Sequence, residues 1–437
     1  MKKFLIETLG CKVNQYESAS FRKELEEVGL VAISPPQQAD IIIINSCAVT
    51  AHAGIQSQKT LRRTLRKHPK AKIIITGCLT EIDADTIANE PLLQGRRFQL
   101  IGNDHKDKIA STIINEAKKS DHLEPGTIGQ AKTICRLPVK RFNKRCRAYL
   151  RVQDGCQSFC TYCIVPYTRG PSRSLPFSEV VSQAKIFARE GHKEIVLTGI
   201  HLGNYGKDLG ENHNIISLIS ALSLETPDVS YRLSSLEPME INRNLLELMA
   251  TRNNIQPHLH IPLQSGNNEI LTRMGRKYTT EQFKELIDLC RNILPLGAIG
   301  IDILVGFPGE SDKHFNLCKT FLKSLDFTYL HVFPYSIRPG TVAAGFTDQI
   351  PKQIKEDRVR ELRSLSDTKK RHFYSSQLGR KQNVLVEGTV DSTGRLKGFT
   401  DNYIAVRFDG PDSLLNTTTM VQLHSVENNF VLAKRVT

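Results

Sequence analysis

The stretch that decides the fold is residues 154–163, DGCQSFCTYC, in which Cys156, Cys160 and Cys163 are separated by three and then two residues. It directly follows an expected strand at 149–153. Three thiolates at this spacing can hold one face of a cubic iron–sulfur cluster and leave one iron without a protein ligand. A structural zinc site is the alternative, but it needs four ligands, and no fourth Cys or His lies at a suitable local spacing. The stretch therefore predicts a cluster whose open iron can chelate a small molecule.

Further expected strands follow this first one and alternate with helical patterns. Apolar runs predict six strands in all, at 149–153, 194–197, 231–234, 258–261, 299–305 and 330–333. Six βα units in roughly 200 residues favour a partial (βα)6 barrel over a full eight-unit barrel. Functional loops of such barrels lie at the carboxyl ends of the strands, which is where the three cysteines stand. We assign residues 148–374 to this central barrel.

The regions on either side of the barrel predict two more domains. Residues 1–119 show the pattern of a small parallel α/β sheet, with strands expected at 4–8, 41–44, 73–76 and 98–101 and helices at 14–28 and 53–68. Residues 120–147 have the composition of a linker, here a basic one. After a long charged helix at 354–377, residues 375–437 alternate short strands with glycines, which predicts a small β-barrel. The predicted fold class is α/β, with the partial barrel between the two smaller domains.

A second group of cysteines lies in the N-terminal domain. Cys11, Cys47 and Cys78 each come directly after an expected strand, in LGC, NSC and TGC. Because the carboxyl ends of parallel strands lie along one edge of a sheet, three loops there can bring the thiols together. Three thiolates again suggest an iron–sulfur cluster with an open iron. The alternative is three unrelated buried cysteines, which are common in protein cores.

Short motifs around both cysteine groups point to one enzyme family. CQSFCTYC at 156–163, TGI at 198–200 and IGIDILVGFPGE at 299–310 resemble segments of the radical S-adenosylmethionine (SAM) superfamily. TLGCKVNQYES, INSCAVT and ITGC, around the N-terminal cysteines, resemble the methylthiotransferase domain, and the C-terminal region resembles a TRAM β-barrel. The resemblance covers essentially the whole chain. It implies two 4Fe–4S clusters, an auxiliary one on Cys11, Cys47 and Cys78 and a radical SAM one on Cys156, Cys160 and Cys163.

The resemblance also implies a mechanism in which SAM has two roles. One SAM is the methyl donor for sulfur held at the auxiliary cluster, and a second is cleaved reductively to give a radical that takes hydrogen from adenine C2. The methylthio group then bonds to that carbon. Such an enzyme needs an external electron donor and a sulfur source. The matching motifs place SAM contacts at Tyr162, Gly199, Ser235 and Gln264, with simple packing as the alternative for Tyr162.

Motifs of the barrel indicate the substrate that the resemblance implies. SSLEP at 234–238, HLHIPLQSG at 258–266 and HVFPYSIRPGT at 331–341 resemble the bacterial enzymes that act on N6-threonylcarbamoyladenosine at position 37 in the tRNA anticodon loop. The alternatives are isopentenyladenosine tRNA, a ribosomal-protein aspartate or, in another class, a non-catalytic iron–sulfur RNA-binding protein. The chain departs from this subfamily at Ser46 and Ala48, where threonine is expected, and at Cys146, where no cysteine is expected.

The charge pattern favours a polyanionic partner. The chain has 59 Lys and Arg against 45 Asp and Glu, which gives a net charge of +14. Residues 41–80 and 125–153 contain no acidic residue at all. Clustered Lys and Arg contact phosphates, although a solvated charged face is the ordinary alternative. We expect RNA contacts from Lys59, Arg62, Arg63, Arg66, Lys140, Arg141, Lys144 and Arg145.

The remaining features predict a cytoplasmic protein with no membrane partner. Ten cysteines in 437 residues do not make a secreted disulfide framework, and no stretch reaches the roughly 18 apolar residues of a spanning helix.

Cys290 and Cys318 fall in helical patterns, which places them in the core. His258 and His260 alternate along an expected strand, so one of them can face the barrel lumen, with packing as the alternative.

Overall fold

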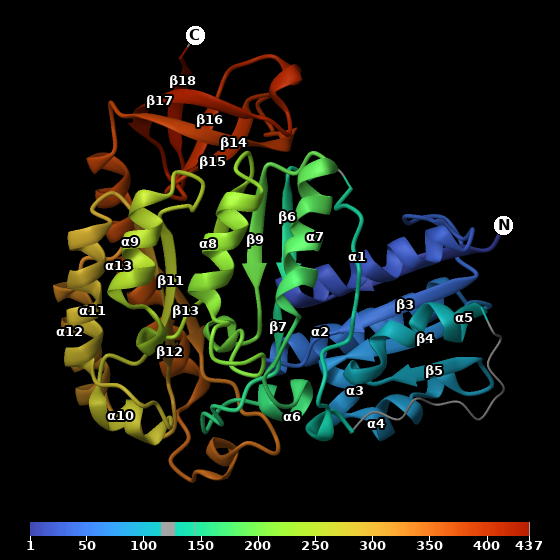
Figure 1. Ribbon diagram of the computed structural model, residues 1–437. Coiled ribbons are helices and arrows are strands. Elements are labelled where there is room, and N and C mark those ends of the chain that lie inside the picture. Colours follow the sequence, from blue (N-terminus) through green and yellow to red (C-terminus); the bar gives the residue numbers. More distant parts are fainter. Residues whose placement is uncertain (115–126, 144, 437) are drawn as a thin grey trace.

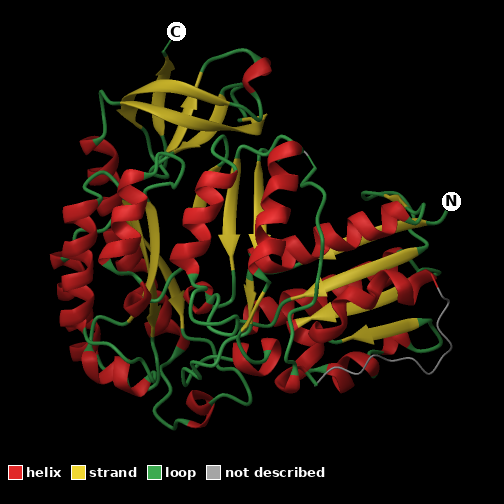
Figure 2. Ribbon diagram, viewed as in Figure 1, coloured by secondary structure: helices red, strands yellow, loops and turns green. Residues whose placement is uncertain are grey.

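A computed structural model describes residues 1–114, 127–143 and 145–436, and Figures 1 and 2 show three parts. The N-terminal part is a parallel sheet with helices on both sides. The central part is a curved set of parallel strands with helices outside it. The C-terminal part is a closed barrel of antiparallel and parallel strands. The mixed α/β class and the C-terminal β-barrel are thus as the sequence predicts.

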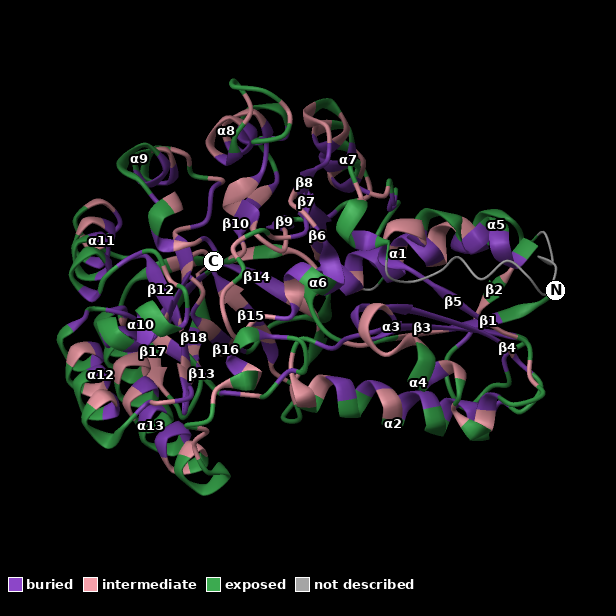
Figure 3. Cartoon of the chain, turned by 90° about the horizontal axis from the view of Figure 1, so that it is seen from below, coloured by how far each residue is buried: buried purple, intermediate pink, exposed green. Residues whose placement is uncertain are grey.

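The N-terminal sheet has the strand order β2-β1-β3-β4-β5, and its strands all run parallel. The central strand β3 is buried along its whole length, as expected of a parallel strand covered on both faces. Figure 3 shows α1 and α5 on one face and α2 on the other. The bounds are β1 (Lys3–Thr8), α1 (Lys12–Glu27), β2 (Val31–Ala32), β3 (Ile41–Ser46), α2 (Ala51–Lys67), β4 (Lys72–Gly77), α3 (Cys78–Ile82), α4 (Ala84–Ala88), β5 (Phe98–Ile101) and α5 (Ile109–Ile114).

The central part contains six parallel strands in two groups of three. The sheets β6-β9-β10 and β11-β12-β13 meet through a bridge between Tyr231 and Ile255. Helices cover the outside (Figure 1). The strands are β6 (Arg147–Arg151), β9 (Glu194–Thr198), β10 (Ser230–Leu233), β11 (His258–Gln264), β12 (Ala298–Val305) and β13 (Tyr329–Pro334). The helices are α7 (Phe177–Arg189), α8 (Ile215–Glu225), α9 (Arg243–Thr251), α10 (Asn268–Arg273), α11 (Thr280–Ile293), α12 (Asp312–Ser324) and α13 (Lys352–Ser376).

The second cysteine group lies in a loop between two short antiparallel strands that follow β6. Strands β7 (Gln153–Asp154) and β8 (Arg173–Ser174) pair antiparallel, and the cysteine loop and helix α6 (Val165–Arg169) lie between them. Gly155 enters this loop with a φ of +77°, and a Cβ there would stand 1.9 Å from the Pro171 carbonyl oxygen. Glycine is therefore required at this turn, because any side chain would collide with backbone.

The C-terminal barrel sits on the amino-terminal end of the central strands. Its strands have the order β14-β15-β16-β18-β17 and are β14 (Lys381–Val390), β15 (Leu396–Thr400), β16 (Ala405–Phe408), β17 (Thr418–Val426) and β18 (Val431–Arg435). The turn after β15 makes the contact: the Tyr403 ring stacks on His258 at 4.2 Å, and Asn402 Nδ2 donates to the Leu296 carbonyl at 2.8 Å. Arg232 also donates to the Asp401 carbonyl at 3.2 Å. The C-terminal barrel consequently covers this end of the central barrel.

Two expectations change in detail. Within the segment expected to be a linker, Ile134, Leu137 and Val139 are buried and pack against the core. The two-residue strands β2, β7 and β8 carry no detectable periodicity in the sequence and were not expected. Cys290 and Cys318 lie buried in α11 and α12, as predicted. Among the described residues, no helix is both long enough and apolar enough to cross a membrane.

Candidate functional site

The first cysteine triad assembles at the carboxyl edge of the N-terminal sheet. Cys11 follows β1 and caps α1, Cys47 follows β3, and Cys78 begins α3 directly after β4. These strands are neighbours in register, so their ends are level. A Cβ on Gly10, which has a φ of +96°, would stand 2.9 Å from the Cys47 thiol sulfur. Gly10 therefore lets the Cys11 loop come close to Cys47.

A buried network of charged side chains lies against this triad. The Arg169 guanidinium donates Nε to Cys78 Sγ at 3.3 Å, Nη1 to Glu17 Oε1 at 2.5 Å and Nη2 to Asn14 Oδ1 at 2.6 Å. Lys106 Nζ binds the other oxygen of Glu17 at 2.5 Å. Arg169 and Lys106 are at most 1% exposed. Burial would disfavour the charge of Arg169, but the adjacent Cys78, Glu17 and Asp154 raise its pKa, so it stays a cation.

The buried network carries more cations than carboxylates. Its cations are Arg151, Arg169, Arg173 and Lys106, and its carboxylates are Glu17 and Asp154, all buried. Burial raises the pKa of Glu17, but Arg169, Lys106 and Arg151 lower it far more, so its carboxylate is ionised. Buried charge of one sign needs a counter-charge. The surplus of cations beside Cys78 therefore suits a negatively charged group held by thiolates.

The second triad lies on one loop, at the carboxyl end of the central strands. Cys156, Cys160 and Cys163 are all partly exposed, in contrast to the buried Cys47 and Cys78. Cys156 Sγ lies 3.4 Å from His201 Nδ1, and Arg276 Nη1 donates to Cys160 Sγ at 3.2 Å. Two of the three sulfurs thus meet a side-chain nitrogen.

The second triad has distinct thiol acidities. Burial raises the pKa of Cys163 to about 12. Burial also acts on Cys156, but hydrogen bonds from His201 and Ser158 outweigh it and lower that pKa below its usual value. In turn, burial lowers the pKa of His201, while Cys156 and Glu240 raise it to about 10. The hydrogen bond between Cys156 and His201 therefore favours the thiolate on one side and the imidazolium on the other.

In neither cysteine triad do the three sulfur atoms lie close enough together to hold a single ion. In the described part of the chain, one group alone of His, Cys, Asp and Glu side chains has its ligand atoms within 4.8 Å of one another, and it contains no cysteine. The wider separation of the thiols fits a body larger than one ion. Helix α6 joins the two triads, since Arg169 reaches Cys78 while the Gly170 carbonyl accepts from the Cys156 amide at 2.9 Å.

The four residues expected to contact SAM lie around the open end of the barrel. Gly199 follows β9, Ser235 follows β10, and Gln264 ends β11 with a φ of +68°. Ser235 Oγ bonds His260 Nδ1 at 2.7 Å. Tyr162 packs against an apolar cluster that includes Met274. Their positions are compatible with the expected role, and the packing alternative for Tyr162 also has support.

Acidic side chains from elsewhere in the chain reach both basic stretches, and in the second stretch Arg136 pairs with Glu179 at 2.9 Å and Arg151 with Asp154 at 3.4 Å. Lys59, Arg62, Arg63 and Arg66 are exposed on α2, but Arg62 pairs with Glu90 at 2.9 Å and Arg63 with Glu7 at 3.6 Å. In the second stretch Lys140, Arg141 and Arg145 are exposed. Lys144 lies outside the described residues. Acidic side chains from elsewhere in the chain therefore neutralise part of the first stretch.

Sequence reasoning missed the cations that touch the sulfurs. His201 and Arg276 are far along the chain from Cys156 and Cys160, the cysteines that they contact. Arg169 lies close in sequence to the second triad but contacts Cys78 of the first. The only signal is their place along the chain: Arg169 follows the cysteine loop, His201 directly follows TGI, and Arg276 lies in RMGRKYT at 273–279. Spacing alone does not assign them a partner.

Known families match both cysteine-bearing parts of the chain. The family model "Radical SAM superfamily" matches residues 150–321, and "Uncharacterized protein family UPF0004" matches residues 3–94. The threonylcarbamoyladenosine tRNA methylthiotransferase MtaB of Bacillus subtilis is 36% identical and covers 95% of this chain and 92% of its own length. That of Aquifex aeolicus is 34% identical, covering 93% and 97%. The tRNA-2-methylthio-N(6)-dimethylallyladenosine synthase of Pelotomaculum thermopropionicum is 32% identical, covering 96% and 95%.

Solved structures share the fold at low sequence identity. The radical SAM methyltransferase TsrM from Kitasatospora setae, solved with cobalamin and a [4Fe-4S] cluster, has a TM-score of 0.58 at 14% identity and covers 78% of this chain and 77% of its own. The cobalamin-dependent SAM radical enzyme OxsB has a TM-score of 0.52 at 12% identity, covering 83% and 56%. At these identities the likeness concerns the fold alone.

Proposed function

We propose that this chain, which belongs to the radical SAM methylthiotransferase family, adds a methylthio group to C2 of N6-threonylcarbamoyladenosine at position 37 of tRNA. Membership makes it a transferase that uses a 4Fe–4S cluster and SAM. The observation that carries the proposal is the pair of cysteine triads joined through the buried Arg169. The substrate rests on relatives at 34% and 36% identity that are named for threonylcarbamoyladenosine.

We assign Cys11, Cys47 and Cys78 to the auxiliary cluster. Burial raises the pKa of Cys47 to about 11, so in the metal-free protein its thiol keeps the proton. Binding of iron displaces such protons, because the thiolate is the ligand. Arg169, one of the four buried cations around Glu17 and Asp154, then meets the negative charge of the triad at Cys78. The donor set and the surrounding charge therefore both fit an iron–sulfur cluster.

We assign Cys156, Cys160 and Cys163 to the radical SAM cluster. With SAM bound, that cluster supplies the 5′-deoxyadenosyl radical, chemistry that side chains cannot provide. His201 donates toward Cys156 and favours its thiolate form, and Arg276 donates to the sulfur of Cys160. Gly199, Ser235, Gln264 and Tyr162 lie around the same end, where we expect SAM to bind.

Arg169 holds the two triads at a fixed separation. Its side chain bonds residues of α1 and α3 from the first domain, while its own helix follows the cysteine loop of the second. A base placed between the triads would meet both the sulfur donor and the radical source. Preorganisation of this kind lowers the entropic part of the barrier.

The remaining partners follow from the reaction. The tRNA backbone would contact the exposed Lys59, Arg66, Lys140, Arg141 and Arg145, and Lys144 keeps its predicted role. Reductive cleavage of SAM needs an external electron donor, and each turnover needs a sulfur source.

Mass spectrometry of tRNA nucleosides tests the proposal. Cells that lack the gene should lose the 2-methylthio form of N6-threonylcarbamoyladenosine and accumulate the unmodified form. The wild-type gene should restore it, Cys47→Ala should not, and Cys135→Ala, a cysteine outside both triads, should restore it as the control. Loss of the methylthio form of dimethylallyladenosine instead would assign the chain the activity named for its 32% identical relative. An unchanged profile would contradict a tRNA substrate.

A further inference from the structure

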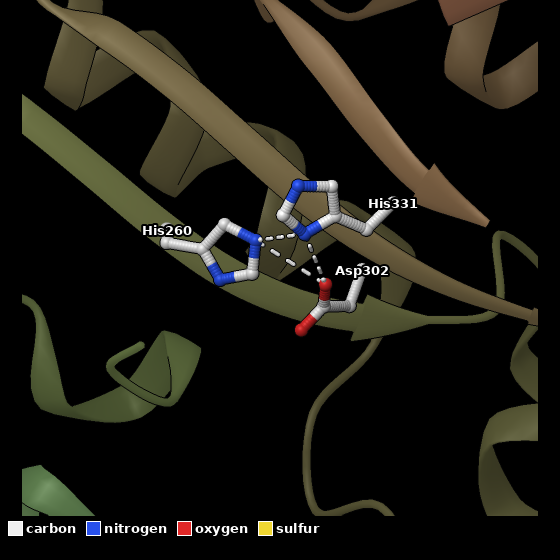
Figure 4. A group of neighbouring side chains, drawn as sticks. All are labelled: His260, Asp302 and His331. Carbon is white, nitrogen blue, oxygen red and sulfur yellow. Dashed lines mark hydrogen bonds and ion pairs between the residues drawn. The ribbon is translucent and has the colours of Figure 1, made fainter. Parts of the chain in front are cut away.

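Three polar side chains gather inside the central barrel, apart from both cysteine triads. His260 on β11, Asp302 on β12 and His331 on β13 come from three adjacent strands and point toward one another (Figure 4). Ile301 and Ile303 flank Asp302 and are fully buried in the core, so by the alternation of strand side chains Asp302 faces the lumen. None of the three is assigned a role by the reaction above.

The three facing atoms form a small triangle. His260 Nε2 lies 2.9 Å from His331 Nδ1, and Asp302 Oδ1 lies 3.2 Å from His260 Nε2 and 3.3 Å from His331 Nδ1. A circle through atoms at these separations has a radius of about 1.8 Å, so one point lies about 2.0–2.1 Å from all three, the metal–nitrogen distance of a zinc site. One ion can therefore touch all three atoms at normal bond lengths.

The hydrogen bonds among these three side chains do not satisfy every buried polar atom. Asp302 Oδ1 is buried and, although close to both nitrogens, makes no hydrogen bond of acceptable geometry to either. The two imidazole nitrogens bond each other instead, and a buried carboxylate oxygen that has ion-pair neighbours but no well-aligned hydrogen bond is costly. A cation at the centre of the triangle would satisfy it together with the two imidazoles.

The surroundings complete the features of a metal site. Ser235 Oγ bonds Nδ1 of His260 at 2.7 Å, which fixes the ring with Nε2 toward the triangle. On the amino-terminal side Tyr329 and His258 fill the lumen, with the His258 Nε2 and Tyr329 hydroxyl 2.8 Å apart. On the other side the His331 side chain is 51% exposed. An ion here would keep open coordination positions on the side where the cysteine loop lies.

We propose that His260, Asp302 and His331 bind one divalent transition-metal ion of the Zn²⁺ or Fe²⁺ class, with an open position for an anionic oxygen ligand. Two imidazoles and one carboxylate are a ligand set that such ions prefer. The ion with Asp302 carries one net positive charge, whereas Asp302 alone would repel an anion. If the proposed function holds, the ligand is the carboxylate of the threonylcarbamoyl group, and that part of the inference rests on it.

Cobalt titration of the full chain tests the metal site without any tRNA. Protein with both clusters reconstituted anaerobically is treated with a chelating resin, mixed with Co²⁺, gel-filtered and analysed for cobalt, iron and sulfide. We expect one equivalent of Co²⁺ with weak visible bands of nitrogen and oxygen coordination and no thiolate charge-transfer band. Asp302→Ala and His331→Ala should lose the cobalt and keep their iron. His424→Ala, an exposed histidine of the C-terminal barrel, is the matched control and should keep both.

Two further variants guard against misfolding. Asp302→Asn and His331→Gln preserve the size of the side chain, and Co²⁺ should raise the thermal unfolding temperature of the wild type but not of these variants. Cobalt retained by the variants at the wild-type level, or absent from the wild type, would overturn the proposal.

Binding of free N6-threonylcarbamoyladenosine tests the ligand separately. Zn²⁺-loaded protein should bind this nucleoside more tightly than resin-treated protein does, while adenosine should bind equally to both. Equal binding of the modified nucleoside would refute the carboxylate contact and leave the metal result intact.

Discussion

The two cysteine triads reach similar chemistry by opposite routes. Cys156, Cys160 and Cys163 share one loop of eight residues, so their proximity is a property of the local sequence. Cys11, Cys47 and Cys78 are brought together only when β1, β3 and β4 pair in register. The local triad is partly exposed at the mouth of a barrel, whereas Cys47 and Cys78 are buried beside a charged network. The triad of Cys11, Cys47 and Cys78 therefore depends on correct folding of the sheet, while the triad of Cys156, Cys160 and Cys163 depends mainly on its own loop.

Removing a cysteine of the local triad should have the largest effect. Cys160→Ala takes one of three ligands from the radical SAM cluster, so both reductive cleavage of SAM and methylthiolation should fall to background. About half of the iron should be lost if each triad holds one equal cluster. Iron analysis and chromatographic measurement of 5′-deoxyadenosine after reduction check this, and full SAM cleavage by the variant would contradict the assignment.

Removing a cysteine of the assembled triad should separate the two activities. Cys47→Ala should lose methylthiolation and about half of the iron, but keep cleavage of SAM, because the ligands of the second cluster are intact. The same two assays apply. Cys290→Ala, in the core of α11, is the control for loss of a buried thiol. A variant that loses both activities equally would mean that the triads do not work separately.

Arg169→Met should test the link between the triads. The substitution takes the Arg169 hydrogen bonds from the buried acceptors Glu17 Oε1 and Asn14 Oδ1, and each loss typically costs about 1–3 kcal/mol of folding free energy. Urea unfolding of the metal-free protein measures the loss. The exposed Arg243, paired with Glu247 on α9, gives the matched control, for which Arg243→Met should cost less than about 1 kcal/mol. Equal costs would show that the network contributes no stability.

Thiol alkylation should rank the cysteines within the metal-free protein. The pKa of Cys156 lies below its usual value and that of Cys163 is about 12, so at pH 8 Cys156 has the larger thiolate fraction and should react first. The advantage should shrink as the pH rises toward 12 and Cys163 also ionises. Mass spectrometry of iodoacetamide-treated peptides gives the rates. His201→Gln removes the imidazolium and should slow Cys156 toward the ordinary thiol rate.

The basic surfaces should show the smallest effect. Lys140→Ala with Arg141→Ala removes two exposed cations, so the slope of log binding constant against log salt for tRNA should fall by about 1.4–1.8. Arg62→Ala with Arg63→Ala is the comparison pair and should change the slope less, because these side chains already pair with Glu90 and Glu7. The reverse order would move the RNA surface to α2.

The sequence predicted what depends on neighbouring residues or on strand ends. The six central strands, the C-terminal barrel and the shared edge of Cys11, Cys47 and Cys78 all follow from periodicity and from the geometry of parallel sheets. Contacts between segments that are distant in sequence could not be predicted from periodicity or sheet geometry. Arg276 lies 116 residues from Cys160. The acid-free run from 41 to 80 likewise meets acids that come from outside it, because charge balance is set in space.

The turn that carries Tyr403 packs over the amino-terminal end of the central barrel. His258, Arg232 and Gln256 are buried beneath it, so the C-terminal barrel covers the amino-terminal end, whereas Phe159 in the cysteine loop is exposed and His331 is half-exposed. Molecules that reach the cysteine loop are therefore expected to enter and leave at the carboxyl end or at the open side of the partial barrel, where β6 and β13 are the outer strands of two separate sheets.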